Sequence, residues 1–155
     1  MMGESKLKVA IASDHGGVTI RKEIISLLEE MNLEYVDLGC DCTTSVDYPD
    51  YAIPVAEMVA KGEVDRGILI CGTGIGMSIT ANKVKGIRCA LVHDTFSAKA
   101  TREHNNSNIL AMGERVIGPG LARDIAEIWL TTSFEGGRHA NRVNKIKKYE
   151  EIYFE

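Results

Sequence analysis

A cysteine directly in front of a glycine-rich loop is the most chemically suggestive feature of the sequence. Cys71 ends the apolar run 67–71, and Gly-Thr-Gly-Ile-Gly follows over residues 72–76. Such a run is typical of a buried strand, and glycines let several backbone N–H groups converge on an anion where the next helix begins. A thiol beside those groups is expected to ionise readily and to act as a base. The alternative is a buried, inert thiol.

The loop 72–76 can also be compared with the loop that binds dinucleotides. That loop has the pattern Gly-x-Gly-x-x-Gly, whereas here the third glycine, Gly76, comes one residue early. Asp94 lies about 20 residues further on, where a ribose-binding acid is expected. No Gly-Lys-Ser/Thr follows the loop, which excludes a Walker-type phosphate loop. A nucleotide-binding module therefore remains the alternative to an oxyanion site.

Basic residues near the C-terminus form a second group of candidates. Arg138 and Arg142 are four residues apart, so a helix would present both on one face. Two guanidinium groups on one face can hold a phosphate through paired hydrogen bonds. A solvated basic surface is the alternative. The glycines at 136–137 favour a site, because they let the chain turn back toward the rest of the fold.

Two further polar residues stand at positions where an element is expected to end. His104 precedes the run Asn-Asn-Ser-Asn at 105–108, which is poor helix material and indicates a helix end beside a polar site. The alternative for His104 is a packed histidine, since it shares helical spacing with Phe96. Asp14 begins the Asp-His-Gly-Gly turn at 14–17 and is suited to contact a substrate hydroxyl or to cap the following helix.

The alternation of short apolar runs with amphipathic stretches predicts the elements that position these residues. The expected strands are 8–13, 34–38, 67–71, 87–92 and 109–112. The expected helices are 20–31, 50–61, a stretch from the glycine loop to 83, 96–104, a helix beginning at Pro119, and 137–153. Asp50 is the expected N-cap of the second helix, with Pro54 in its first turn.

Strands that alternate with helices predict a three-layer α/β/α sandwich with a five-stranded, parallel, Rossmann-like sheet and an extra C-terminal helix. Ligands of such sheets bind at the carboxyl ends of the strands. The length of 155 residues predicts a single domain spanning 1–155. The helix over 137–153 carries many charges and is expected at an interface between subunits.

Composition restricts the class of protein further. The formal net charge of −4 argues against nucleic acid or an anionic membrane as a partner. The sequence carries neither a secretory signal nor a membrane-spanning run, so we expect a cytoplasmic protein. The 4 cysteines are accordingly expected to be free thiols. The spacing of Cys40 and Cys42 matches neither a redox pair nor a zinc-ligand pair.

Taken together, the motifs give the chain a resemblance to a known family over nearly its whole length. It resembles the type B ribose-5-phosphate isomerases, in a wider family that includes the galactose-6-phosphate and allose-6-phosphate isomerases. The motifs that carry the resemblance are Ser13-Asp14-His15-Gly16-Gly17, Asp47-Tyr48-Pro49 with Tyr51-Ala52, the segment 67–76, His104-Asn105-Asn106-Ser107-Asn108 and Glu135-Gly136-Gly137-Arg138-His139.

The resemblance implies an aldose–ketose isomerisation between ribose 5-phosphate and ribulose 5-phosphate, with neither metal nor organic cofactor. It makes Cys71 the base, the amides of 72–76 the enediolate site, and Thr73 and His104 the ring-opening groups. The catalytic residues that it implies are Cys71, Thr73, His104 and Asp14. The substrate-binding residues that it implies are His15, Tyr48, Gly72, Gly74, Ile75, Gly76, Asn105, Arg115, Arg138 and Arg142, of which His15 and the three arginines would hold the phosphate.

The resemblance also implies a homodimer with shared active sites, or a dimer of such dimers. The neighbouring subunit would supply His104, Asn105 and Arg115. A related hexose 6-phosphate of the allose or galactose type is the alternative substrate. A nucleotide-binding module and a sugar-phosphate sensor without turnover are the alternatives from other functional classes.

Overall fold

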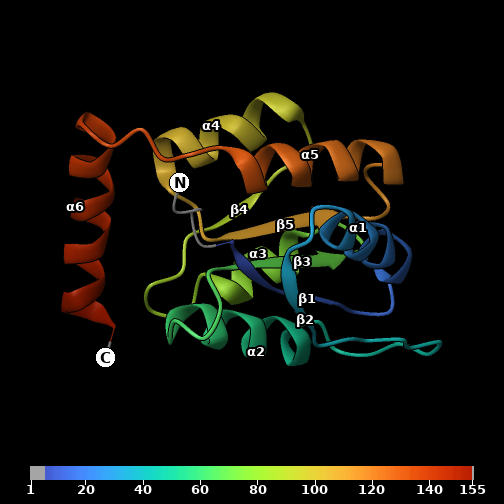
Figure 1. The fold of residues 1–155 in the computed structure, drawn as a ribbon. Helices are drawn as coiled ribbons and strands as arrows, with labels where there is room; N and C mark the ends of the chain where they lie inside the picture. Colours follow the sequence, from blue (N-terminus) through green and yellow to red (C-terminus); the bar gives the residue numbers. More distant parts are fainter. Residues whose placement is uncertain (1–5, 155) are drawn as a thin grey trace.

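The computed structural model describes residues 6–154, which form a parallel sheet with helices on both faces (Figure 1). The strands are β1 (Lys8–Ser13), β2 (Glu34–Asp37), β3 (Arg66–Cys71), β4 (Cys89–Leu91) and β5 (Ile109–Gly113). The helices are α1 (Val18–Glu30), α2 (Pro49–Ala60), α3 (Ile75–Ala81), α4 (Thr95–Asn105), α5 (Pro119–Thr131) and α6 (Arg138–Tyr153). Within the described range, no helix has the length and apolar character needed to cross a membrane.

The strand order brings together the two loops that the sequence singled out. All five strands are parallel and lie in the order β2-β1-β3-β5-β4. The chain leaves β1 toward one edge of the sheet to form β2 and continues on the other side of β1 to form β3. The order therefore switches between β1 and β3, where ligands of such sheets bind. The predicted fold class is confirmed.

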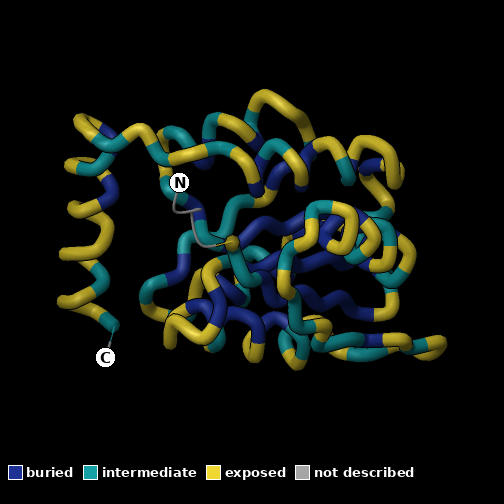
Figure 2. Tube along the Cα trace, in the orientation of Figure 1, coloured by how far each residue is buried: buried dark blue, intermediate teal, exposed yellow. Residues whose placement is uncertain are grey.

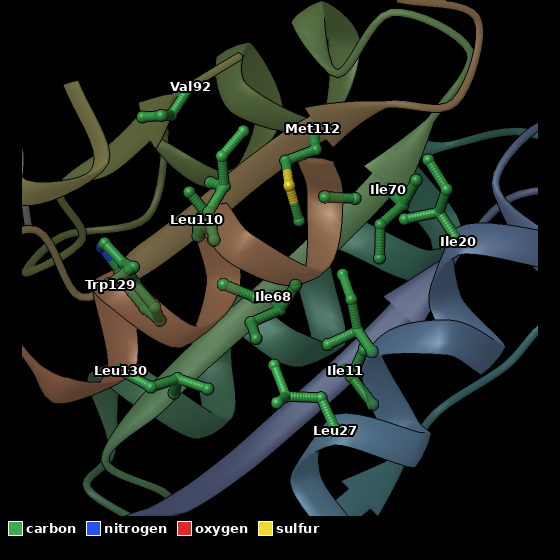
Figure 3. Close-up of a cluster of buried hydrophobic side chains, with 14 of the residues drawn as sticks. Ile11, Ile20, Leu27, Ile68, Ile70, Val92, Leu110, Met112, Trp129 and Leu130 are labelled. Carbon is green, nitrogen blue, oxygen red and sulfur yellow. The ribbon is translucent and has the colours of Figure 1, made fainter. Parts of the chain in front are cut away.

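One hydrophobic core lies between the sheet and the layer of α1, α4 and α5. Figure 3 shows Ile11, Ile68 and Leu110 of neighbouring strands packed beside Leu27 of α1 and Trp129 of α5. All five side chains are at most 1% exposed. Burying apolar side chains of this size contributes about 1.5–3 kcal/mol each. This core fixes the sheet against one helical layer.

The other face of the sheet carries Cys71. Side chains alternate along a strand, so Ile70 enters the first core and Cys71 enters the second. This second core consists of the sheet, α2 and α3, with Val55 and Met77 among its buried side chains. The sulfur of Cys71 is consequently held on the side of the sheet where α3 begins.

Helix α6 lies outside the three layers and beside the end of α4 (Figure 1). His139 and Val143 are its only buried residues, and most of its length is exposed (Figure 2). Its exposed surface includes the apolar side chains Ile146, Tyr149, Ile152 and Tyr153. Such a surface is typical of a helix that contacts another molecule.

Two predictions about α2 are wrong. The helix begins at Pro49 with Tyr48 as its N-cap, so Asp50 lies in the first turn instead of capping it. Pro49 is suited to the first helical position because its fixed φ is helical and its missing N–H would have no intrahelical partner. The earlier start places Pro54 beyond the first turn, inside the helix.

The expectation of four free thiols is also wrong. A disulfide joins Cys40 and Cys42 in the loop between β2 and α2, whereas Cys71 and Cys89 are free. Cys71 is buried and Cys89 is partly buried. Burial raises the pKa of Cys89 to about 12, so this thiol stays protonated at neutral pH.

Arg21 of α1 fastens the loop that carries the disulfide to the end of β1. Its guanidinium is 1% exposed and donates to the Ser13 hydroxyl at 2.9 Å and to the Cys40 carbonyl at 2.6 Å. It also forms ion pairs with Asp37 and Asp41 at 2.5 and 2.7 Å. A planar fork of donors meets all four partners at once, which one ammonium group cannot do.

Replacing Arg21 by lysine tests this contribution. Arg21→Lys should lower the free energy of unfolding by about 1.5–3 kcal/mol, because charged hydrogen bonds are lost at a buried position. Chemical denaturation measures the change. Arg123→Lys is the matched control: Arg123 pairs with glutamates on α1 at the surface, so its loss should cost under about 1 kcal/mol. Equal effects of the two changes would contradict the role given to Arg21.

Candidate functional site

The loops after β1 and β3 touch at the carboxyl edge of the sheet. The Asp14 N–H donates to the Ile70 carbonyl at 3.2 Å, and the Gly16 N–H donates to the Asp14 carboxylate at 2.8 Å. A Cβ on Gly17 would lie only 2.6 Å from the Ile70 carbonyl oxygen. Glycine is therefore required for this approach, which puts Asp14 beside the end of β3. Asp14 does not cap α1, whose N-cap is Gly17; Glu114 instead accepts from the Ile20 N–H.

The glycine loop wraps around the sulfur of Cys71. The Gly74 N–H donates to Cys71 Sγ at 3.0 Å, and the Ile75 N–H donates to Thr73 Oγ1 at 3.2 Å. Gly74 has a φ of +79°, and a Cβ there would lie 2.6 Å from a methyl carbon of Leu91. A side chain at this position would be both strained and obstructed. The tight turn keeps the sulfur in contact with the loop.

Several amide groups of this loop are left free. Among the hydrogen bonds of the described residues, the N–H groups of Gly72, Thr73 and Gly76 have no acceptor. Unpaired backbone donors near the protein surface are ready to bind an anionic oxygen. Helix α3 has only 7 residues, so the individual amides matter more here than the dipole of a long helix.

Tyr48 and His15 connect the long loop before α2 to this edge. The Tyr48 ring packs so closely on Gly76 that a Cβ there would lie 2.2 Å from Cε1 of the tyrosine. His15 Nδ1 accepts the Val46 N–H at 3.1 Å, which holds the loop beside the Asp14 turn. A hollow of about 390 Å³ results, lined by Asp14, Tyr48, Cys71, Gly72, Thr73, Ile75, Gly76, Ile79 and Arg115.

The position of Arg115 differs from the expectation that a neighbouring subunit supplies it. Arg115 lies just after β5, and its N–H donates to the Gly72 carbonyl of the same chain at 3.0 Å. A Cβ on Gly72 would lie 3.6 Å from Arg115 Cδ. Because β3 and β5 are paired in parallel, the segments after them emerge side by side. Arg115 therefore lies beside Cys71 of its own chain.

His93 and Asp94 support the site, although the sequence analysis assigned them no structural role. His93 Nε2 accepts the Gly113 N–H at 2.9 Å, and a Cβ on Gly113 would lie 2.5 Å from the Thr73 carbonyl carbon. Asp94 caps α4 by accepting the Ser97 N–H at 2.6 Å. Aspartate is a preferred N-cap residue, so its position just before the expected helix 96–104 could have indicated that cap. Engaged as a cap, Asp94 is not directed at a nucleotide ribose.

The remaining predicted site residues lie at the opposite edge of the sheet, where the strands begin. Helix α4 ends with His104 and Asn105 shortly before β5 begins, and the Asn105 carbonyl accepts from Arg88 Nε at 3.1 Å, just ahead of β4. Arg138 is the first residue of α6, and Arg142 follows one turn later; both are exposed. The His104 side chain is 45% exposed, so it is not the packed histidine considered as the alternative.

A histidine and a glutamate that the sequence analysis assigned no role lie with this second group. The rings of His104 and His139 are stacked, with centroids 4.3 Å apart. Glu135 Oε1 lies 3.5 Å from His104 Nε2 and 3.6 Å from His139 Nε2. Burial, and then the charge of His104, lower the pKa of His139. Glu135 and His139 are the first and last residues of the Glu-Gly-Gly-Arg-His motif, and this motif could have indicated that they belong to the site.

One chain thus contains two separate halves of the predicted site. Cys71 pairs with Gly113 at the end of β5, whereas α4 with His104 ends where β5 begins. The 5 residues of β5 span about 13 Å at about 3.3 Å per residue. The cysteine, the free amides and Asp14 form one half. The exposed histidine and the two α6 arginines form the other.

A cysteine, a carboxylate and free amides around one hollow at the switch of a parallel sheet define an enzyme-type site for a small anionic substrate. The family model for ribose/galactose isomerases matches residues 9–146, and the chain belongs to that family. It is 77% identical over 146 residues to the Bacillus subtilis (strain 168) protein provisionally named sugar phosphate isomerase YwlF, covering 94% of this chain and 98% of that one.

Two further relatives have more specific names. Ribose-5-phosphate isomerase B of Escherichia coli (strain K12) is 47% identical over 144 residues, covering 93% of this chain and 97% of that one. The solved structure of Clostridium thermocellum ribose-5-phosphate isomerase B has a TM-score of 0.92 and 52% identity. That match covers 95% of this chain and 99% of the other.

The His93–Gly113 hydrogen bond predicts a pH dependence of stability. Burial lowers the pKa of His93 from 6.5, and Asp94 only partly opposes this. Below about pH 6.5 the unfolded chain therefore binds a proton that folded His93 resists, so stability falls as the pH falls toward the lowered pKa. Glutamine can accept the same bond without titrating. Denaturation of wild type and His93→Gln between pH 7.5 and 5 should show the variant losing less stability. A difference independent of pH would contradict this.

Proposed function

We propose that this protein interconverts ribose 5-phosphate and ribulose 5-phosphate by proton transfer through an enediolate. The observation that carries the proposal is the contact of the Cys71 sulfur with a loop whose neighbouring amides are free. Membership of the ribose/galactose isomerase family supports the same reaction. Moving a proton between two carbons beside a carbonyl needs both a base and a site for the developing oxyanion.

In the proposed reaction the Cys71 thiolate removes the proton from carbon 2 of the open-chain aldose. The electron pair moves into the bond between carbons 1 and 2, and the carbonyl oxygen becomes the enediolate oxygen. The free amides around Gly72 and Gly76 stabilise this charge. The hydroxyl proton on oxygen 2 passes to oxygen 1, and the electron pair of that O–H bond forms the carbonyl of carbon 2. The electron pair between carbons 1 and 2 then takes the proton of the thiol onto carbon 1, which gives the ketose and regenerates the thiolate with no redox partner. Each proton and electron pair is accounted for by substrate and enzyme.

The other residues in and beside the hollow bind the substrate. Asp14 is 8% exposed and lies beside the cysteine, suited to accept from sugar hydroxyls. The Tyr48 ring forms one wall, and Thr73 assists ring opening from the glycine loop. Arg115 and His15 supply cationic and hydrogen-bonding groups for the phosphate. All five are assigned to the chain that supplies the cysteine.

We further propose a homodimer in which each site combines the two halves from different chains. His104 and Asn105 of one chain would open the sugar ring held by the other, and Arg138 with Arg142 would reach the phosphate. The exposed apolar side chains of α6 support an interface there. We assign the protein to the cytoplasm, where sugar phosphates occur.

An isomerase of a hexose 6-phosphate, of the galactose or allose type, is the second candidate. The family description includes galactose, and a hollow of about 390 Å³ has room for a sixth carbon. Comparing kcat/KM for ribose 5-phosphate, allose 6-phosphate and galactose 6-phosphate distinguishes the two. Ribose 5-phosphate should be preferred; a higher value for either hexose phosphate would replace the pentose assignment.

Removing the thiol tests the base. Cys71→Ala should lower kcat by about 10²–10⁴-fold, the usual contribution of a general base, and should stop exchange of the carbon-2 proton with deuterated solvent. Cys89→Ala is the control, since that thiol stays protonated and lies away from the hollow. In Cys89→Ala, exchange of the carbon-2 proton of the substrate should continue at the wild-type rate. Full exchange in Cys71→Ala would eliminate the assignment.

Mixing two inactive variants tests whether each site combines two chains. When Cys71→Ala and His104→Asn are refolded together in equal amounts, about half of the dimers should be mixed, and each would carry one unaltered site. Activity should recover to about a quarter of wild type. No recovery would mean that both residues serve the same site from one chain.

The position of Arg115 provides the matched control for that experiment. Cys71→Ala mixed with Arg115→Ala should stay inactive, because both changes affect the same half and no unaltered site can form. Recovery in this mixture would instead assign Arg115 to the neighbouring subunit.

A further inference from the structure

His104, Glu135 and His139 form a three-residue cluster where the end of α4 meets the start of α6. The Glu135 N–H donates to the Glu103 carbonyl at 3.1 Å, which fixes the segment before α6 against α4. Only His104 has a part in the proposed isomerisation. One ligand atom from each of the three side chains lies within 4.8 Å of the other two. The cluster therefore needs an explanation of its own.

The polar atoms of this cluster face one another but form no good hydrogen bonds with one another. The two distances from Glu135 Oε1 to the histidine Nε2 atoms, 3.5 and 3.6 Å, are too long for good hydrogen bonds. His139 Nε2 is buried and has no hydrogen-bond partner among the described residues. Its side chain is only 8% exposed. A buried nitrogen without a partner is costly, and binding an ion is one way in which such a group is satisfied.

The distances suit a small cation. A tetrahedral Zn²⁺ with bonds of about 2.05 Å separates its ligand atoms by about 3.3 Å. The two glutamate–histidine separations are already close to that value. The stacked rings are inclined by 15°, so one must turn to aim its lone pair at the metal. His104 can do so, because its side chain is 45% exposed at a helix end.

We propose that His104, Glu135 and His139 bind a divalent transition-metal ion of the zinc class, and that this ion inhibits the isomerase reversibly. Two imidazoles and one carboxylate form a known zinc ligand set that leaves a fourth position open. The imidazoles favour Zn²⁺, Ni²⁺ or Cu²⁺ over Mg²⁺ and Ca²⁺. The bound ion occupies the Nε2 lone pair that His104 needs for ring opening. The inhibition rests on the proposed function, whereas the binding does not.

Direct binding tests the site without reference to catalysis. Titrating the full-length protein with Co²⁺ should produce the visible absorption of tetrahedral cobalt, and calorimetry should measure Zn²⁺ binding. Glu135→Gln and His139→Gln should each weaken binding by about tenfold or more, since even changes outside the ligand set cost 10–100-fold. Glu127→Gln, at an exposed position of α5, is the matched control and should bind like wild type. Circular dichroism and thermal melts establish that each variant is folded.

Two results, one spectroscopic and one calorimetric, would overturn the site. An intense sulfur-to-cobalt charge-transfer band would assign the metal to Cys71 instead of the histidines. Unchanged Zn²⁺ affinity in both Glu135→Gln and His139→Gln would exclude this ligand set even if the protein binds metal.

An activity measurement then tests the consequence. Zn²⁺ should inhibit wild type, a chelator should restore the rate, and Glu135→Gln should need at least about tenfold more Zn²⁺ for half-inhibition. Tight binding with an unchanged rate would overturn the inhibitory part of the proposal. Tight binding by a protein that isomerises none of the sugar phosphates would leave the metal site established and reject the proposed function.

Discussion

The parallel pairing of β3 with β5 is the constraint on which the arrangement of the site depends. Parallel strands bring all their carboxyl ends to one edge, and each connecting segment must return to the other edge. Cys71 is the last residue of β3 and Arg115 follows the end of β5, so the two residues share one edge. His104 and Arg138 lie where connections have returned to the other. The same geometry that brings Cys71 and Arg115 together separates them from His104 and Arg138. In the proposed homodimer, a second copy of the chain would bring the two groups together.

Close backbone approach creates the chemistry at the carboxyl edge. Gly74 and Gly113 let the turn after β3 pack against β5, and Gly76 accommodates the Tyr48 ring. A turn this tight cannot pair all of its amides internally, so several remain free beside the Cys71 sulfur. The donors that would stabilise an enediolate thus result from the packing that holds the loop in place.

At the opposite edge, where the strands begin, charge and burial determine the environment of the histidines. One carboxylate, Glu135, faces two imidazoles, and the more deeply buried of them, His139, has no hydrogen-bond partner for Nε2 in the described part of the chain. A group intended to exchange protons with a sugar must keep its lone pair accessible. That accessibility also makes it a good metal ligand. The proposed catalytic role of His104 and the proposed sensitivity to zinc therefore have the same physical origin.

The sequence by itself determined the features that depend on near neighbours. Apolar periodicity placed the five strands and six helices, and the glycines marked the Cys71 loop. Only the tertiary structure decided that Arg115 joins Cys71 and that Glu135 and His139 surround His104. It also decided the Cys40–Cys42 disulfide and the earlier start of α2. Periodicity and turn chemistry act over a few residues, whereas these contacts depend on strand order and helix packing, which are set by the whole chain.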